Sequence, residues 1–216
     1  MLAATNDTID VTNEIMLNQI PEPSIHCYSI DTVLDDNQAA HYSTEFLNSI
    51  ELSGIPQHDL HLKKGAVIFL MRNLRIEHQH CNGSRYIIQD VSAHLITAQR
   101  LSSSDPNDVL LIPQIPHLTK DTDFPFIMKR LQFPVKVAFA MTFNRAQGQS
   151  LAKCGILLPR SVWTHGQLYV AFSRCSDPQN VKVFVDQENF EDWDLPEGTF
   201  THNVVYTEIL HRDQEL

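Results

Sequence analysis

The chain has 216 residues, with 26 acidic residues against 16 lysines and arginines, so its formal net charge is −10 and its isoelectric point is near 5.4. That sign argues against a protein that binds a polyanion over its whole surface. With 43% hydrophobic and 19% charged residues, the composition is that of a globular protein of one or two domains and excludes a largely disordered chain.

The first sixty residues predict short helices and an extended segment. Thr5 or Asn6 is suited to cap a helix that carries apolar residues as far as Ile20, and Pro21 stops it. Residues 22–37 contain a short alternating run followed by an acidic turn, residues 44–50 predict a second short helix, and residues 54–56 indicate a boundary.

The middle of the chain changes to a β pattern. Short apolar or alternating runs occupy residues 65–71, 85–89, 94–99 and 109–112, with turn residues such as Asn82 and Gly83 between them. They predict a small antiparallel sheet or barrel, which the proline-rich residues 113–125 close.

From Phe133 onward, strands alternate with helices. Residues 136–142 and 155–158 predict buried strands and residues 181–185 a last strand, while residues 144–151 and 164–174 predict helices, the second with a capping box from Thr164 to Gln167. This alternation predicts a parallel sheet covered by helices. The first sixty residues fit that sheet better than the barrel, which makes the barrel an insertion in a single α/β lobe.

The charge is divided unevenly along the chain. Residues 1–60 have ten acidic and no basic residues, residues 61–180 have fourteen basic and seven acidic, and residues 181–216 have two basic and nine acidic. Any nucleic-acid surface is therefore expected in the middle segment. No stretch approaches the ~18 apolar residues of a membrane span and the first residues lack a signal-peptide pattern, so the expected protein is soluble and intracellular, with no membrane partner.

Two segments in the last third carry a family resemblance. Residues 139–151 (FAMTFNRAQGQSL) and 165–174 (HGQLYVAFSR) closely resemble the PIF-one-like helicases of superfamily one, nearest to the large eukaryotic and transposon-associated group. The resemblance covers roughly residues 2–185 and includes LAATN at 2–6, EFLNS at 45–49, LKKGA at 62–66, RN at 72–73, CNGSR at 81–85 and QFPV at 132–135.

The resemblance implies an architecture. Helicases of this family have two RecA-like lobes with ATP between them and single-stranded DNA across both. This chain looks like the second, C-terminal lobe, at residues 1–56 and 132–185, with an inserted accessory β-barrel at 57–131 and an acidic tail at 186–216. The fold class expected is thus an α/β RecA-like parallel-sheet lobe with a small antiparallel barrel.

The resemblance also implies a missing part. The first lobe carries the glycine-rich phosphate cradle and the acidic pair that holds Mg²⁺. This chain has seven glycines and no Gly-Lys dipeptide, so we expect it to bind neither ATP nor Mg²⁺ stably on its own. The expected partners are single-stranded DNA and a first RecA-like lobe, supplied upstream in cis or in trans.

Site residues follow from the matched motifs. Arg174 matches an arginine finger, which stabilises charge on a transferring phosphoryl group, and Gln147 with Gly148 matches the segment that faces the nucleotide and senses its γ-phosphate. Thr5 and Asn6 resemble a motif near the same cleft, although a helix cap explains them equally well. Without the resemblance, Arg174 would be interpreted as a solvated arginine at a helix end, where its charge is favourable.

Other residues match DNA-facing positions. Thr142 and Asn144 resemble contacts to the DNA backbone, and Arg145 could supply the charge that family members often have at the position of Asn144. Tyr169 fits either a place near the cleft or a core position. The predicted barrel carries a basic group that suits single-stranded DNA, although ordinary surface charge explains it too; it comprises Lys63, Lys64, Arg72, Arg75 and Arg85, followed by Lys129, Arg130 and Lys136.

The cysteines and histidines do not predict a metal. The four cysteines form no C-x-x-C pair, and the cluster of His78, His80 and Cys81 lacks the second ligand pair of a closed zinc site. No metal site is expected.

Three functions remain open from the sequence. The first is the C-terminal part of an ATP-dependent 5′-to-3′ DNA helicase, nuclear in location and inactive alone, in a family tied to DNA repair, recombination and telomere maintenance. The second is a non-catalytic DNA-binding or interaction remnant of a transposon-derived helicase. The third is a decaying transposon reading frame.

Overall fold

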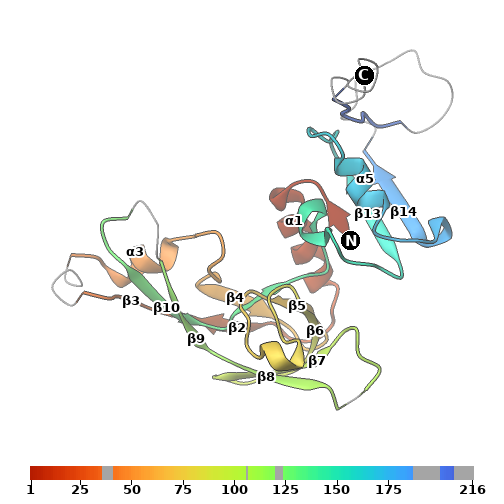
Figure 1. The fold of residues 1–216 in the computed structure, drawn as a ribbon. Coiled ribbons are helices and arrows are strands. Elements are labelled where there is room, and N and C mark those ends of the chain that lie inside the picture. Colours follow the sequence, from red (N-terminus) through yellow and green to blue (C-terminus); the bar gives the residue numbers. More distant parts are fainter. Residues whose placement is uncertain (36–40, 106, 120–123, 187–199, 207–216) are drawn as a thin grey trace. The chain divides into compact units, whose positions relative to one another are not determined.

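The computed structural model describes residues 1–35, 41–105, 107–119, 124–186 and 200–206. The chain forms two compact units, coloured by sequence in Figure 1. Unit 1 spans residues 1–14 and 140–216, and unit 2 spans residues 15–139.

Unit 1 is built on a parallel sheet with strand order β12-β1-β13-β14. Its centre is strand β1, where Leu2 pairs with Met141 on one side and with Ile156 on the other. Leu2 and Ile156 are fully buried, as expected for a parallel sheet whose inner strands are covered on both faces. The elements of unit 1 are β1 (Leu2–Ala3), α1 (Asn6–Asn18, which runs on into unit 2), β12 (Met141–Thr142), α4 (Phe143–Ala146), β13 (Cys154–Leu158), α5 (Gln167–Phe172), η2 (Pro178–Asn180) and β14 (Val181–Val185).

The two helices that carry the helicase-like motifs are shorter than the sequence predicts. Helix α4 ends at Ala146 rather than near Leu151, because Gly148 adopts a left-handed φ of 79°. Helix α5 begins after Gly166, which also has φ 79°, and no side chain caps it. The predicted capping box from Thr164 to Gln167 is therefore wrong, and the Gln167 side chain instead accepts a hydrogen bond from the Trp163 N–H.

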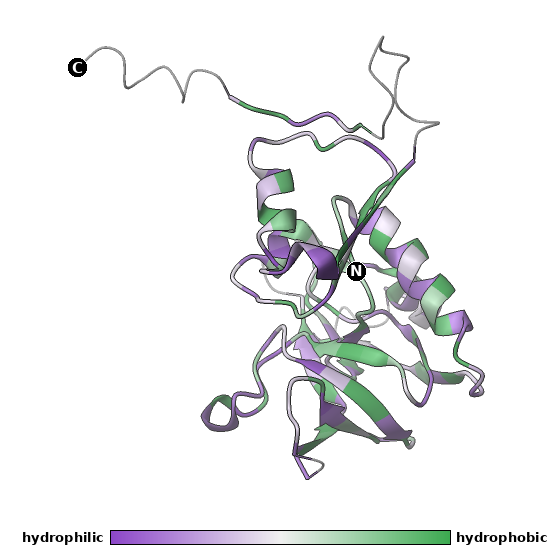
Figure 2. Cartoon of the chain, turned by 90° about the vertical axis from the view of Figure 1, so that its right-hand side faces the viewer, coloured by the Kyte–Doolittle hydropathy of each residue, from purple (hydrophilic) through white to green (hydrophobic). Residues whose placement is uncertain are grey.

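Unit 2 consists of antiparallel sheets. A five-stranded sheet has the order β11-β5-β6-β7-β8, a three-stranded sheet the order β3-β10-β9, and β2 pairs with β4 alone. Hydrophobic and hydrophilic residues alternate along these strands (Figure 2), and β8 alternates strictly between exposed and buried positions. The elements of unit 2 are β2 (Ile25–Tyr28), β3 (Ile30–Val33), α3 (Thr44–Ser49), β4 (Asp59–Leu62), β5 (Val67–Leu70), η1 (Ile76–His78), β6 (Arg85–Val91), β7 (Leu95–Arg100), β8 (Val109–Pro113), β9 (Ile115–Leu118), β10 (Met128–Gln132) and β11 (Val135–Val137).

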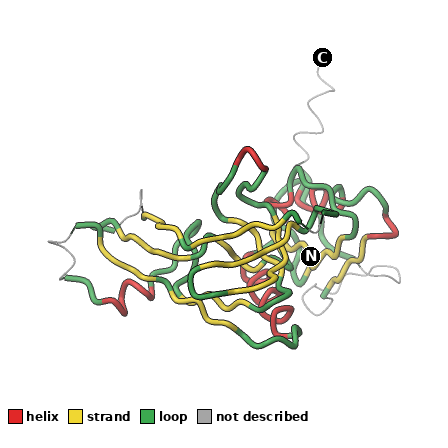
Figure 3. The backbone as a smooth tube through the Cα atoms, turned by 90° about the horizontal axis from the view of Figure 1, so that it is seen from below, coloured by secondary structure: helices red, strands yellow, loops and turns green. Residues whose placement is uncertain are grey.

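The fold class predicted from the sequence is confirmed, a mixed α/β chain with a parallel sheet and antiparallel sheets. The compact units nevertheless divide the chain differently from the expected lobe at 1–56 and 132–185 with a barrel at 57–131. Residues 15–56 lie in unit 2, because β2 pairs with β4 and β3 pairs with β10. Figure 3 shows the strands of the chain in yellow and its helices in red.

The predicted strand at residues 136–142 is in fact two strands. Residues 135–137 form β11, which pairs antiparallel with β5 in unit 2, whereas Met141 and Thr142 form β12 of the parallel sheet. The sequence also favours a helix near residues 204–211, which lies largely outside the described residues, as does most of the acidic tail. No helix among the described residues is long and apolar enough to cross a membrane.

Candidate nucleotide-facing site

The carboxyl edge of the parallel sheet gathers four of the predicted site residues. Ala3 and Thr142 are register partners at the ends of β1 and β12. Thr5 and Asn6 follow the first strand directly, and Asn144 lies in the first turn after the second. In open α/β sheets, this edge is where ligands bind.

Both threonines cap helices. The Thr5 hydroxyl oxygen accepts from the Thr8 N–H at 3.3 Å and caps α1. The Thr142 hydroxyl oxygen accepts from the Arg145 N–H at 3.2 Å and caps α4. A capping hydroxyl still has its own proton, so each threonine can donate to an incoming phosphate oxygen while it holds its helix.

Arg174 is the centre of the site. Its guanidinium lies beyond the end of α5 and reaches the loop after α4, where Nη1 donates to the carbonyl oxygens of Gln149 at 3.2 Å and Ala146 at 3.5 Å. Nε donates to Val170 at 2.9 Å. The backbone N–H of Leu151 also donates to the carbonyl oxygen of Arg174 at 2.8 Å.

Those bonds bring the predicted catalytic residues together. The two carbonyls that hold Nη1 belong to the residues on either side of Gln147 and Gly148, and both of these residues are exposed. The sequence places the arginine and this pair 26 or more residues apart, and the structure puts them in one place.

Arg174 is nevertheless largely committed to the fold. Four of its five N–H groups have partners, since Nη2 also donates to the Ser173 hydroxyl at 2.8 Å. The guanidinium is held at a fixed position by the protein, and an incoming anion would compete with carbonyl oxygens for its donors.

Sequence reasoning missed Asn13 as a positioning residue. It is buried in α1, and its side-chain oxygen accepts from the Ala140 N–H at 2.8 Å, which fixes the segment that leads into β12. The sequence signal that could have identified Asn13 is its position as a single asparagine on the apolar face of the predicted helix.

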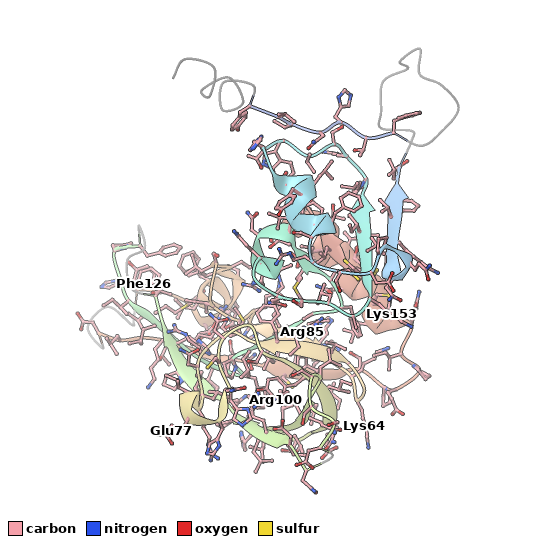
Figure 4. All side chains as sticks on the ribbon, turned by 45° about the vertical axis from the view of Figure 1, so that its right-hand side comes forward. Lys64, Glu77, Arg85, Arg100, Phe126 and Lys153 are labelled. Carbon is pink, nitrogen blue, oxygen red and sulfur yellow. The ribbon has the colours of Figure 1, made fainter. Side chains whose placement is uncertain are left out.

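The basic residues of unit 2 lie in different environments. Lys63 is partly buried and donates from Nζ to the Ile20 carbonyl at 2.9 Å. Lys64 is exposed in the turn near Ile88, whereas Arg85 begins β6 opposite Phe69, so the two lie about 10 Å apart along the strand at ~3.3 Å per residue (Figure 4). Burial lowers the pKa of Arg85.

The Arg130 side chain is buried and is not part of the protein surface. It is 1% exposed and forms an ion pair with the buried Asp31 at 2.6 Å. Its inclusion in a basic DNA wall is therefore wrong. Tyr169, by contrast, is 76% exposed, so a core position for it is wrong as well.

His80 belongs to a buried hydrogen-bond network. Its Nδ1 lies 2.8 Å from the Tyr86 hydroxyl and 3.0 Å from Nη2 of Arg100. Burial and the nearby Arg100 lower the pKa of His80. That nitrogen is occupied, so the H-x-H-C pattern does not present its ligand atoms together.

The fold is of the mixed α/β class, with a parallel sheet that carries polar groups along its carboxyl edge in one unit and antiparallel sheets in the other. Residues 45–91, from α3 to β6, match the family model described as DNA helicase Pif1, 2B domain. The chain is 27% identical over 197 residues to the ATP-dependent DNA helicase Pif1 of Campylobacter jejuni, covering 85% of this chain and 41% of that protein. It is 28% identical to the Xenopus laevis ATP-dependent DNA helicase PIF1, covering 84% of this chain and 27% of that protein.

Solved structures show the same fold. The crystal structure of Pif1 helicase from Candida albicans superposes with a TM-score of 0.64 at 24% identity, covering 84% of this chain and 44% of that one. Bacteroides Pif1 bound to ssDNA gives a TM-score of 0.61 at 19% identity, covering 88% and 42%. The chain is therefore similar to Pif1 helicases over most of its length, and it spans less than half the length of the curated relatives it matches.

Proposed function

We propose that the chain is the C-terminal part of an ATP-dependent 5′-to-3′ DNA helicase of the nucleus. In this proposal it supplies Arg174 to an ATP site that a first RecA-like lobe completes, and it contacts the backbone of single-stranded DNA. Relatives named as ATP-dependent DNA helicases support this, as does the Bacteroides Pif1 structure in complex with ADP-AlF3 and ssDNA.

One observation carries the proposal, the convergence of Arg174 on the loop of Gln147 and Gly148. A guanidinium fixed beside an exposed amide and a glycine can stabilise charge on a γ-phosphoryl group, while the amide orients a water or a phosphate oxygen. Arginines in this role contribute ~10³ to 10⁵ in rate in other systems.

The residues present fit only part of an ATP site. Arg174, Gln147 and the backbone at Gly148 suit the γ-phosphate, and Thr5 and Asn6 lie at the sheet edge where a nucleotide binds in such folds. The sequence has no Gly-Lys dipeptide to cradle the phosphates, so that cradle and the Mg²⁺ ligands belong to the first lobe. ATP supplies the phosphoryl group when bound, and this chain orients it and neutralises its charge.

The DNA contacts in this proposal come from the α4 region. Thr142 can donate its hydroxyl proton to a phosphate oxygen while capping the helix, and Asn144 and Arg145 are exposed beside it. Hydroxyl, amide and guanidinium donors position a strand without reading its bases.

A test of the enzyme function measures ATP hydrolysis with single-stranded DNA, by the chain alone and mixed with a separately produced first lobe of a Pif1 relative. We expect background hydrolysis by the chain alone and DNA-stimulated hydrolysis by the mixture. Arg174→Lys, which keeps the charge but loses the forked geometry, should lower the rate of the mixture ~10³-fold. Arg160→Lys is the matched control, an exposed arginine of the same unit.

Two results of that test would refute the proposal. One is Arg174-dependent hydrolysis by the chain alone, which would show that no other lobe is needed. The other is a mixture in which Arg174→Lys folds, by circular dichroism, and hydrolyses ATP as fast as Arg160→Lys.

A non-catalytic DNA-binding or interaction remnant is the second candidate. The four internal hydrogen bonds of Arg174 favour it, because they give the side chain a structural role that needs no nucleotide. In that case Arg174→Lys lowers the melting temperature of the chain, and no first lobe produces hydrolysis with it.

A further inference from the structure

A second cluster of ligand-type side chains lies in unit 2, on two paired strands. Strands β2 and β4 pair antiparallel, and His26 lies directly opposite His61. Asp59 is two residues before His61 on the same strand, so all three side chains project from one face of the ladder.

The other face of the ladder is core. Cys27, Leu60 and Leu62 are buried, with exposed fractions of 8%, 5% and 0%. The alternation of the strands therefore fixes which side chains face solvent, and a slip of register by one residue would bury the histidines. Because the apolar residues of the two strands pack into the core, the two imidazoles and the carboxylate lie on the solvent-facing side of the ladder.

The three ligand atoms already converge. Oδ2 of Asp59 lies 3.1 Å from Nδ1 of His26 and 2.9 Å from Nε2 of His61. The three atoms lie within 4.8 Å of one another, and the two imidazole rings are 4.2 Å apart between centroids. Burial by itself raises the pKa of Asp59. Hydrogen bonds from His61 and His26 lower it by more, so the pKa of Asp59 is below its ordinary value.

We propose that His26, Asp59 and His61 form a site for a divalent transition metal, with Zn²⁺ as its occupant. Zn²⁺ binds imidazole nitrogen at ~2.0–2.1 Å and carboxylate oxygen at ~2.0–2.2 Å, which places tetrahedral ligand atoms roughly 3.4 Å apart. The nitrogen-to-oxygen distances in the cluster need to lengthen by only a few tenths of an ångström to reach that value.

The side chains are free to make that adjustment. The His26, Asp59 and His61 side chains are 43%, 33% and 54% exposed, so water can enter and fill the remaining coordination position. To bind the metal through these nitrogens, each neutral ring carries its proton on its other ring nitrogen, and because protons compete with the metal for the imidazoles, binding weakens as the pH falls. Two imidazoles with one carboxylate favour Zn²⁺ over Mg²⁺ or Ca²⁺, which prefer oxygen ligands.

A metal at this site would link two strands of unit 2 that are far apart in the sequence. Strands β2 and β4 are joined by four residue pairs, and the segment between them holds β3 and α3. A Zn²⁺ ion bound across the ladder would oppose its separation, and the stabilisation would grow with metal concentration.

The test is calorimetric titration of the chelator-treated chain with Zn²⁺ at pH 7.5 in a buffer that does not bind metal. We expect the wild-type chain to bind with a Kd on the order of micromolar, with a melting temperature that rises as Zn²⁺ is added. His61→Asn and Asp59→Asn should each weaken this binding at least tenfold and remove the rise. His94→Asn, an exposed histidine of unit 2 outside the cluster, is the matched control and should behave as the wild type.

The controls make the result decisive. The chain has eleven histidines, so weak uptake alone does not support the site. The proposal fails if His61→Asn, shown to be folded by circular dichroism, binds Zn²⁺ as tightly as His94→Asn does. It also fails if the wild type shows no binding at 100 μM Zn²⁺, in which case the cluster is only a hydrogen-bonded His–Asp–His network.

Discussion

His117 shows how one buried side chain can set the response of the chain to pH. It is 0% exposed on β9, and neither ring nitrogen has a hydrogen-bond partner. Burial, with help from Arg72 and Arg130, lowers the pKa of His117 to about 4. The folded state therefore keeps this imidazole neutral where an unfolded chain would protonate it.

The predicted consequence is a loss of stability in mild acid. An unfolded His117 takes up a proton near pH 6.5 and the folded one only near pH 4, so the unfolded state binds more protons between those values. Stability from this residue is complete above about pH 6.5 and is lost as the pH falls toward 4, by ~2 kcal/mol at pH 5.

Urea denaturation at pH 7 and pH 5 measures that effect, with His117→Leu as the variant that cannot titrate. The wild type should lose ~2 kcal/mol more than His117→Leu between the two pH values. His94→Leu removes an exposed histidine and should keep the wild-type difference. Equal losses in the wild type and His117→Leu would count against a buried, neutral His117.

Arg130 is the second residue that governs stability. Its Nε donates to both oxygens of Asp31 at 2.9 and 3.0 Å, and its Nη atoms donate to the carbonyls of Leu47, Ile50 and Pro56. One side chain thus ties β10 to β3 and to the end of α3. Arg130→Met leaves Asp31 charged, buried and unpaired, so we expect a loss of ~3–5 kcal/mol in the free energy of unfolding.

The neighbouring position supplies the control. Lys129 precedes Arg130 on β10 and is exposed, so Lys129→Met removes a positive charge from the same strand without opening a buried pair. It should change the free energy of unfolding by less than ~0.5 kcal/mol. A similar effect from both variants would show that the buried ion pair is not what stabilises this part of unit 2.

At the scale of single elements, the loop after α4 depends on one glycine. Gly148 has φ 79° and ends the helix, and a side chain there would meet no atom within 4 Å. Gly148→Ala should therefore cost ~1–2 kcal/mol through backbone strain alone, without a steric clash. Denaturation with urea measures this, and Ser150→Ala, an exposed neighbour, should be nearly neutral. A neutral Gly148→Ala would mean that the loop relaxes to an ordinary conformation.

The elements themselves divide into those the sequence predicts and those it does not. The apolar runs at residues 155–158 and 181–185 are correctly predicted as strands; the first alternates between buried and partly buried positions in the parallel sheet, whereas the second is an edge strand with mostly exposed side chains. The compact units place residues 15–56 with the antiparallel sheets, and the sequence could not indicate this because the placement depends on β2 pairing with β4 and β3 with β10, and such pairings leave no local signature.

The candidate sites show the same contrast between local patterns, which the sequence reveals, and long-range contacts, which it does not. Arg174, Gln147 and Gly148 were found because they lie in motifs that resemble a family, yet the bonds of Arg174 to Ala146 and Gln149 needed the fold. Asp59 and His61 have a spacing that puts both on one strand face, but His26 joins them only through the register of β2. The sequence can thus indicate candidate ligands on one strand, but it cannot predict which residue of the neighbouring strand lies opposite them.

At the scale of the whole molecule, the division into two units changes how the uneven distribution of charge along the sequence is interpreted. The basic segment at residues 61–180 carries a net +7, but it is not a structural unit. Unit 2 has thirteen acidic and ten basic residues and is net −3, whereas unit 1 has thirteen acidic and six basic residues and is net −7. Arg130 is also buried, so neither unit has the excess of positive surface charge that tight binding to DNA requires.

Weak binding of single-stranded DNA with a shallow salt dependence is therefore expected for the chain alone. Each phosphate contact on a single strand contributes a slope of about −0.7 to log K against log salt, so three contacts give about −2. Fluorescence anisotropy of a labelled oligonucleotide between 20 and 200 mM salt measures the slope. Lys64→Gln should make it shallower by about 0.7, while Lys153→Gln, an exposed lysine of unit 1 outside the matched DNA positions, should leave it unchanged. A slope steeper than about −5 would show that the chain has a basic surface that the charges of its units do not account for.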